Sequence, residues 1–256
     1  MGQKEENCET NLISRQLNLS FHAVCLTLLS LLLPLSYLLF CRLSYTPLPP
    51  TLNSIILYVA ISFLSLSSLF YSITGHTLHI ELPNCIAWAI LCLFQACITF
   101  GIEGTIRDGF LPLGNTSAFA HEMWLKRTLL FIGIYEQMML WKEKFVEPVV
   151  DGTFIEKERM EQGIDRFIMG LSFSGLWLGL LQTEVGPLVL ASTRGGFSKR
   201  VGWCDFVIWF VTFATLMTGF VRAVQFLVWQ LSILLQFMYC RVEEQADGLA
   251  QGEDEV

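Results

Sequence analysis

Two residues of opposite charge lie within apolar stretches, where charged side chains are rare. Glu136 interrupts the apolar run 127–145, and Arg222 is the only acid or base between Asp205 and Arg241. A charge at the centre of a membrane helix costs about 2.5–3.5 kcal/mol on insertion scales, so such residues tend to pair or to line an ion path. We expect Glu136 and Arg222 to form an intramembrane charged pair. A structural pair is favoured over a proton or ion relay, because no second acid lies at mid-depth.

A second candidate for chemistry is the sequence Gly170-Leu171-Ser172-Phe173-Ser174-Gly175. It is comparable to the Gly-x-Ser motif of rhomboid-type intramembrane proteases. A serine nucleophile needs a general base within hydrogen-bond reach. No histidine follows residue 121, and His22 is the only histidine at the depth of a predicted span. Because the motif lacks its partner, we predict no catalytic site here.

Possible metal ligands gather in His76-x-x-His79-x-Glu81, a tight connection between two predicted spans. These donors suit zinc, and His121-Glu122 would extend the set. The two loops lie on opposite faces, however, if the span between them crosses the membrane. The sequence also lacks a His-Glu-x-x-His motif, a histidine-box array and a phosphate-binding glycine loop. We therefore predict no metal site and no cofactor.

Small residues at four-residue spacing occur in the apolar stretch 167–190. Gly170 and Ser174 form one such pair, and Gly175 and Gly179 form another. Small residues at this spacing allow two helix backbones to approach closely in a membrane. The spacing predicts that these four residues lie at a close helix–helix contact.

Long apolar helices must position these residues, and the longest apolar stretch is 203–240. Its polar and small residues follow one another with a period near 3.5 and in a single phase. These are Asp205, Thr212, Thr215, Gly219, Arg222, Gln225, Trp229, Ser232 and Gln236. The middle of the stretch contains no Pro, Asn or Asp, which turns usually employ. We therefore predict one continuous helix that turns a polar face toward a helical bundle.

The composition of the whole chain is typical of a membrane protein. Of its 256 residues, 53% are hydrophobic and 15% are charged, and the mean hydropathy is +0.53. We expect an all-α, polytopic integral membrane bundle over residues 19–241, with about six transmembrane helices and a long C-terminal helix. The predicted spans are 19–40, 52–74, 83–102, 127–145, 167–190 and 203–240. In 127–145, Glu136-Gln137 splits the apolar core, so a re-entrant or interfacial helix is the alternative there.

Basic residues do not decide the orientation. With six spans, eight Lys and Arg residues lie on the amino-terminal side and seven on the other. Without the span 127–145 the division becomes ten and five, which favours five spans with the amino terminus outside. The sequon at Asn115 favours six, because its loop must be luminal if Asn115 is glycosylated. We keep six spans with both termini in the cytosol, in a membrane of the secretory pathway or in the plasma membrane.

Both ends of the chain are polar. Residues 1–18 form a short polar tail without the features of a signal peptide. Residues 242–256 carry six acids and no base. Such a composition predicts a disordered tail that repels nucleic acid and anionic lipid. Most of the eight cysteines fall within predicted spans, which indicates buried thiols rather than a disulfide framework.

No complete catalytic set emerges from these observations. We expect a multi-pass membrane protein that acts as a packing, assembly or accessory partner in a membrane complex. Its partners would be the lipid bilayer and other membrane proteins, and not nucleic acid. The alternative is a small transporter or channel that uses Glu136 and Arg222. A third reading, an intramembrane lipid-modifying enzyme, has only scattered histidines in its favour. A polar cavity at Glu136 would favour transport, and a dry interior would favour assembly.

Overall fold

The computed structural model describes residues 17, 20–43, 52–76, 82–107, 120–152, 162–186, 188–189 and 203–251. Within these ranges all regular secondary structure is helical. Five helices are long and apolar enough to cross a membrane, namely Ser20–Arg42, Leu52–Thr74, Asn84–Glu103, Gly163–Glu184 and Phe206–Tyr239. The predicted all-α class is therefore confirmed. The segment 127–145, predicted as a sixth span, is not among the five.

The elements in chain order have the following bounds. They are α2 (Leu32–Leu43), α3 (Leu52–Thr74), α4 (Asn84–Arg107), α5 (Ala120–Trp141), the π-helical turn η2 (Lys142–Val146), α6 (Glu147–Asp151), α7 (Gln162–Leu176), the π-helical turn η4 (Trp177–Leu181), α8 (Gln182–Glu184) and α10 (Trp203–Gln251). Residues 20–30 are also helical and lead into α2 through a turn at Leu31. Pro34 follows closely, and a proline inside a helix removes a backbone donor and bends the chain.

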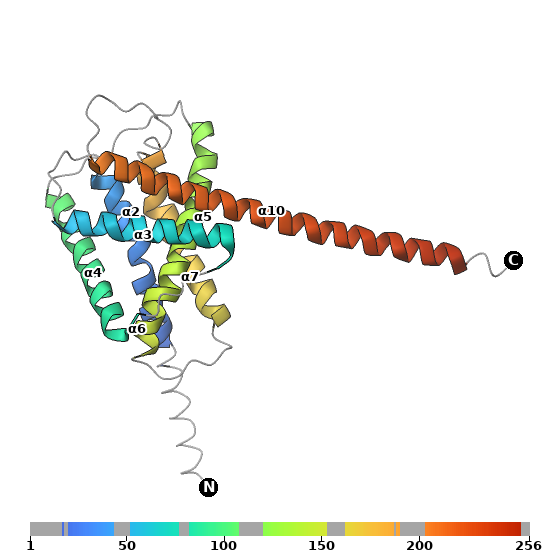
Figure 1. The fold of residues 1–256 in the computed structure, drawn as a ribbon, viewed down its shortest axis with the longest axis horizontal. Helices are drawn as coiled ribbons and strands as arrows, with labels where there is room; N and C mark the ends of the chain where they lie inside the picture. Colours follow the sequence, from blue (N-terminus) through green and yellow to red (C-terminus); the bar gives the residue numbers. More distant parts are fainter. Residues whose placement is uncertain are drawn as a thin grey trace, which may run out of the picture.

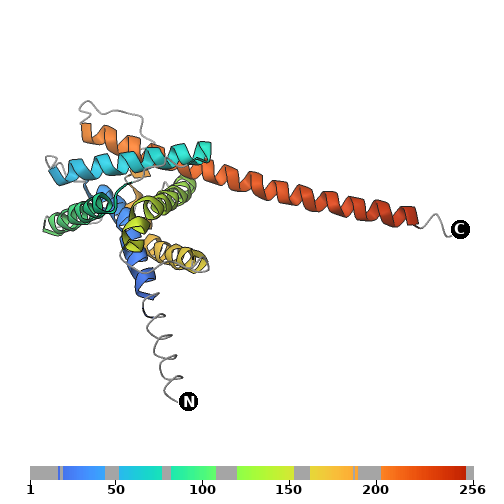
Figure 2. The same ribbon diagram turned by 60° about the horizontal axis from the view of Figure 1, so that its bottom comes forward.

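The helices pack in two layers that cross each other. In Figure 1, α3 and the first half of α10 run side by side across α2, α4, α5 and α7. Figure 2 shows the same two helices together on one face of the other four. The most extensive contacts of α10 are with α5 and α3. The predicted spans therefore do not all run in one direction, and the arrangement differs from an up-and-down bundle.

Helix α5 occupies the centre of this arrangement. It contacts α10, α3 and α2. Its residues Leu130, Ile134 and Met138 are fully buried, and its last residue, Trp141, packs on Phe94 of α4 with ring centroids 4.8 Å apart. Because other helices cover much of α5 from Leu129 onward, this part of the helix tolerates polar residues that a lipid-facing helix would not. This enclosure explains why 127–145 is less apolar than the five helices of span character.

Helix α10 is one unbroken helix of 49 residues. Its length is about 73 Å at a rise of 1.5 Å per residue. The predicted continuity through Gly219 and Arg222 is confirmed. The helix also continues past Arg241 as far as Gln251, into the acidic segment for which the sequence predicts disorder. The segment 243–251 is rich in Glu, Gln, Ala and Leu, which favour helix, whereas residues 252–256 lie outside the described part of the chain.

Candidate functional site

Glu136 and Arg222 lie together at the point where α10 leaves the other helices. Arg222 Nη2 is 3.2 Å from Glu136 Oε2 on α5. The guanidinium carbon of Arg222 lies 4.7 Å from the centroid of the Tyr71 ring on α3. Arg222 Nη1 also donates a hydrogen bond of 3.1 Å to Gln225 Oε1. The structure thus brings the two residues together, and their pair joins α5, α10 and α3 at one point.

This ion pair lies at the edge of the bundle rather than in its interior. The side chains of Arg222 and Glu136 are 25% and 23% exposed. One turn further along α10, Gln225 Nε2 donates a hydrogen bond of 2.5 Å to the backbone oxygen of Ser72 on α3. Arg222 Nε is buried and has no hydrogen-bond partner among the described residues. Two of these three polar contacts join α10 to a neighbouring helix, as polar residues at helix-packing sites do.

A second polar cluster lies deep in the bundle, where four helices meet. It consists of Tyr37 on α2, Ser65 on α3, Gln137 on α5 and Thr215 on α10, and none of the four is exposed. The Tyr37 hydroxyl donates to Gln137 Oε1 and lies 2.8 Å from Thr215 Oγ1. Gln137 Nε2 donates to Thr215 Oγ1 at 2.9 Å, and Ser65 Oγ lies 3.2 Å from the Tyr37 hydroxyl. A buried polar network satisfied in this way specifies how the helices register with one another.

Two helix backbones approach each other closely where α5 crosses α10. A Cβ atom at Gly219 would overlap the backbone oxygen of Leu129 and would come within 3.0 Å of the Gly133 nitrogen. A Cβ atom at Gly133 would overlap the backbone oxygen of Thr215. Only glycine fits at these two positions, because any side chain would meet backbone atoms that cannot rotate away.

The predicted close contact on α7 and η4 is corrected by the structure. Gly175 and Gly179 are exposed, and a Cβ atom at either would meet nothing within 4 Å. A Cβ atom at Gly170 would come no closer than 4.0 Å to the Tyr135 hydroxyl. Ser174 donates a hydrogen bond to the Gly170 oxygen of its own helix. The four-residue spacing alone does not distinguish a buried small-residue face from an exposed one.

Two further polar contacts join distant parts of the chain. Arg42, at the end of α2, forms a bidentate pair with Glu184 of α8, with Nε–Oε2 and Nη2–Oε1 distances of 3.0 and 3.2 Å. His22 Nε2 lies 2.9 Å from Asp151 Oδ1 at the end of α6. Neither pair is expected from the spacing of the residues along the chain. The six-span order offers a signal for the first pair, since Arg42 and Glu184 each end a span on the same side.

The remaining residues considered for chemistry do not assemble into a described site. His79, Glu81 and Asn115 lie outside the described residues, as do the side chains of His121 and Glu122. Among the residues that the structure does describe, no group of three or more His, Cys, Asp or Glu could hold a metal ion.

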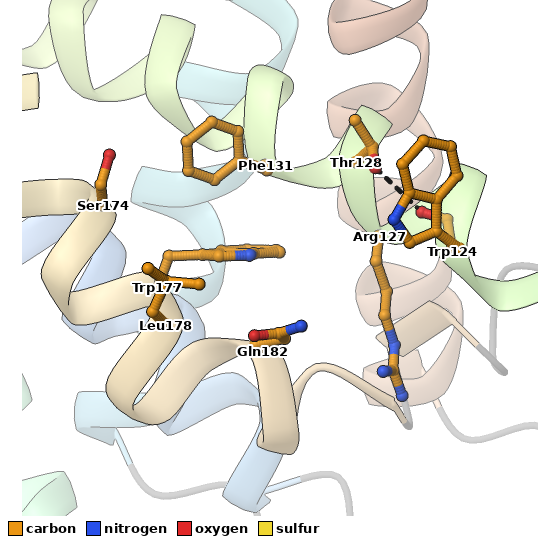
Figure 3. A pocket seen from close by; sticks show the side chains of 8 residues that line it. All are labelled: Trp124, Arg127, Thr128, Phe131, Ser174, Trp177, Leu178 and Gln182. Carbon is orange, nitrogen blue, oxygen red and sulfur yellow. Dashed lines mark hydrogen bonds between the residues drawn. The ribbon is translucent and has the colours of Figure 1, made fainter. Parts of the chain in front are cut away.

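A cavity of about 310 Å³ opens between the amino-terminal part of α5 and the end of α7 with η4 and α8 (Figure 3). It is lined by Trp124, Arg127, Thr128, Phe131, Ser174, Trp177, Leu178 and Gln182. A smaller cavity of about 150 Å³ is lined by Leu39, Asn53, Ser54, Leu57, Cys97, Phe100 and Gly101. Neither of these cavities is lined by Glu136 or Arg222.

The second half of α10 projects away from the other helices (Figure 1). Every residue from 224 to 239 is exposed. The exposed residues include ten large apolar side chains beyond the bundle, namely Phe226, Leu227, Val228, Leu231, Ile233, Leu234, Leu235, Phe237, Met238 and Tyr239. We call residues 224–239 the α10 arm. An apolar surface of this extent is typical of contact with lipid or with another protein.

No protein-family model matches the chain, and neither a curated protein nor a solved structure matches it. Its class therefore follows from its own residues. In the part of the chain that the structure describes, the regular elements are helical and five helices have the length and apolarity that a membrane span requires, and these features indicate a membrane protein.

Proposed function

We propose that this protein is a non-enzymatic assembly partner in a membrane complex and that the α10 arm binds a transmembrane helix of another subunit. The observation that supports the proposal is the polar face of α10. This face does not end where the bundle ends, and beyond Gln225 its described hydrogen bonds and ring contacts lie within α10 itself.

Along the first half of α10, the polar face is directed at α5 and α3. Thr212 and Thr215 are buried, Gly219 meets the backbone of α5, and Gln225 bonds to Ser72 of α3. Trp229, Ser232 and Gln236 continue this face in the same phase along the arm. All three are exposed. The polar face that contacts α5 and α3 thus continues along α10 beyond the point where it leaves these two helices.

The chemistry of the arm distinguishes its two sides. The side opposite the polar face carries Leu227, Leu231, Leu234 and Met238, and these suit lipid. The Ser232 hydroxyl donates a hydrogen bond of 2.8 Å to the Trp229 oxygen of its own helix, and the amide of Gln236 gains no hydrogen bond from lipid tails. Such groups associate with polar or small residues of a neighbouring transmembrane helix. We therefore expect the partner to contact the arm through Trp229, Ser232 and Gln236.

The alternative, a small transporter or channel, rests on Glu136 and Arg222. Three observations favour assembly over it. These two residues contact each other and nearby helices, the central cluster of Tyr37, Gln137 and Thr215 is closed to solvent, and both cavities described above are lined by other residues. Transport would need a path that passes the ion pair.

The test is the size of the complex extracted in a mild non-ionic detergent. We expect the native protein to elute as a complex larger than the monomer. The variant Ser232→Leu/Gln236→Leu removes the polar groups of the arm and keeps it apolar, so we expect it to elute as a folded monomer. Light scattering measures the protein mass, and mass spectrometry of the native complex identifies its subunits.

The matched control is Leu231→Ser/Leu234→Gln, which places the same two polar groups on the opposite side and leaves Ser232 and Gln236 unchanged. We expect this variant to keep the complex. The proposal is wrong if the native protein is monomeric in detergent and in nanodiscs. It is also wrong if the control disperses the complex and the Ser232→Leu/Gln236→Leu variant does not.

A further inference from the structure

The cavity between α5 and α8 has one polar end and one apolar end. Figure 3 shows Arg127 of α5 and Gln182 of α8 facing each other across it, with the Trp177 ring lying between Gln182 and Phe131. The rings of Phe131 and Trp177 meet edge to face with centroids 5.2 Å apart. Leu178 lies at the apolar end and is 68% exposed. The cavity is therefore open on its apolar side.

Arg127 contributes a positive charge that the described residues do not neutralise. Its Nε is buried and has no hydrogen-bond partner among them. Glu184, the acid of the facing helix α8, forms a bidentate pair with Arg42. Leaving a buried guanidinium donor without an acceptor costs free energy, and an anion in the cavity would remove that cost.

The local backbone shapes the apolar end of the cavity. Trp177 and Leu178 belong to the π-helical turn η4 (Trp177–Leu181), and single π turns are frequent at binding sites. The Trp177 side chain is 7% exposed and holds its ring against Phe131. Trp124, by contrast, is 67% exposed at the rim. Arginine and tryptophan together are typical of the level where a membrane helix meets lipid head groups.

We propose that this cavity binds the phosphate head group of an anionic membrane phospholipid, with the start of its acyl chain along Phe131, Trp177 and Leu178. Arg127 and Gln182 donate hydrogen bonds to the phosphate oxygens. The planar guanidinium suits an oxyanion because it donates two parallel hydrogen bonds. A volume of about 310 Å³ accommodates a head group and a few methylenes, and the open apolar side lets the rest of the chain lie in the bilayer.

The experiment measures lipid retained by the full-length protein in detergent, by native mass spectrometry. Phosphatidylglycerol supplies the anionic head group, and phosphatidylcholine is the zwitterionic comparison. We expect one phosphatidylglycerol to be retained in preference to phosphatidylcholine. The variant Arg127→Gln should bind it about tenfold more weakly or worse, because a hydrogen bond to a charged group is lost.

The matched control is Lys126→Gln, which removes a neighbouring cation that does not line the cavity, and it should leave binding unchanged. A second variant, Ser174→Phe, fills the apolar end with Arg127 intact and should also abolish selective retention. If Arg127→Gln does not fold, the Ser174→Phe variant still tests whether the cavity binds the lipid.

Three outcomes would overturn the proposal. Equal retention by Arg127→Gln and the native protein would show that Arg127 does not bind the lipid. An equal loss in Lys126→Gln would show that only surface charge matters. Displacement of phosphatidylglycerol by the same concentration of inorganic phosphate would show a site for a free anion, to which the apolar end contributes nothing.

Discussion

The salt bridge between Arg222 and Glu136 is more than a pairwise contact, because the guanidinium also lies over the Tyr71 ring. Both side chains are about a quarter exposed. The pair is therefore weaker than one enclosed in a core, yet removal of either member leaves a charge beside apolar surface.

We predict that Glu136→Leu and Arg222→Leu each destabilise the protein by about 1–3 kcal/mol, between the values for exposed and fully buried pairs. Arg222→Leu should cost more, because it also removes the contact with Tyr71. The double variant should recover part of the loss, since neither charge is left alone. Thermal unfolding in detergent measures all three, and strictly additive losses would show that the two charges do not interact.

At the level of the helices, the crossing of α5 and α10 depends on two glycines. Gly133 and Gly219 leave room for the opposing backbone oxygens of Thr215 and Leu129. A larger residue at either position would force the two helices apart, because the atoms it would meet belong to the backbone and cannot rotate away. Gly175 is also a helical glycine, on α7, but a Cβ atom there would meet nothing within 4 Å. It therefore serves as a matched control for Gly219.

We predict that Gly219→Ala lowers the stability by about 3 kcal/mol, the upper part of the usual range for overpacking. Gly175→Ala should be neutral or stabilising, because alanine favours helix over glycine by up to about 1 kcal/mol. The two midpoints of thermal unfolding, measured under the same conditions, check this difference. If Gly175→Ala were the more destabilising change, the crossing of α5 and α10 would not be as described.

At the scale of the whole molecule, the contact between the end of α2 and α8 is informative about the orientation of the chain in the membrane. Arg42 and Glu184 bring the carboxyl ends of the first and fifth predicted spans together. The order of six spans places both residues on the same side of the membrane. An order in which 127–145 does not cross would place them on opposite sides if the other spans cross.

The six-span order predicts that Asn115 is luminal and becomes glycosylated in a secretory membrane. Digestion with an endoglycosidase should then increase the electrophoretic mobility of the native protein, and Asn115→Gln should abolish this shift. A sequon moved into the segment 153–161 should stay unmodified, since that segment would face the cytosol. Modification in 153–161 but not at Asn115 would reverse the proposed orientation.

Several features could be predicted from the sequence because they depend on local periodicity or on the cost of isolated charge. The unbroken course of α10 follows from a polar stripe that keeps one phase and from the absence of turn residues. The proximity of Glu136 and Arg222 follows from the cost of leaving either charge alone in an apolar setting. The all-helical class follows from long apolar runs, in which helices satisfy their own backbone hydrogen bonds.

Other features were decided by tertiary packing alone. Small-residue spacing occurs on both α7 and α10, but only the crossing with α5 determines that Gly219 is enclosed and Gly175 is not. The low apolarity of 127–145 cannot reveal that α5 lies at the centre, because a helix enclosed by protein and a helix outside the membrane can both have low apolarity. The cluster of Tyr37, Ser65, Gln137 and Thr215 joins residues up to 178 positions apart. Contacts between residues so far apart in the sequence form only because the two helix layers cross at this point.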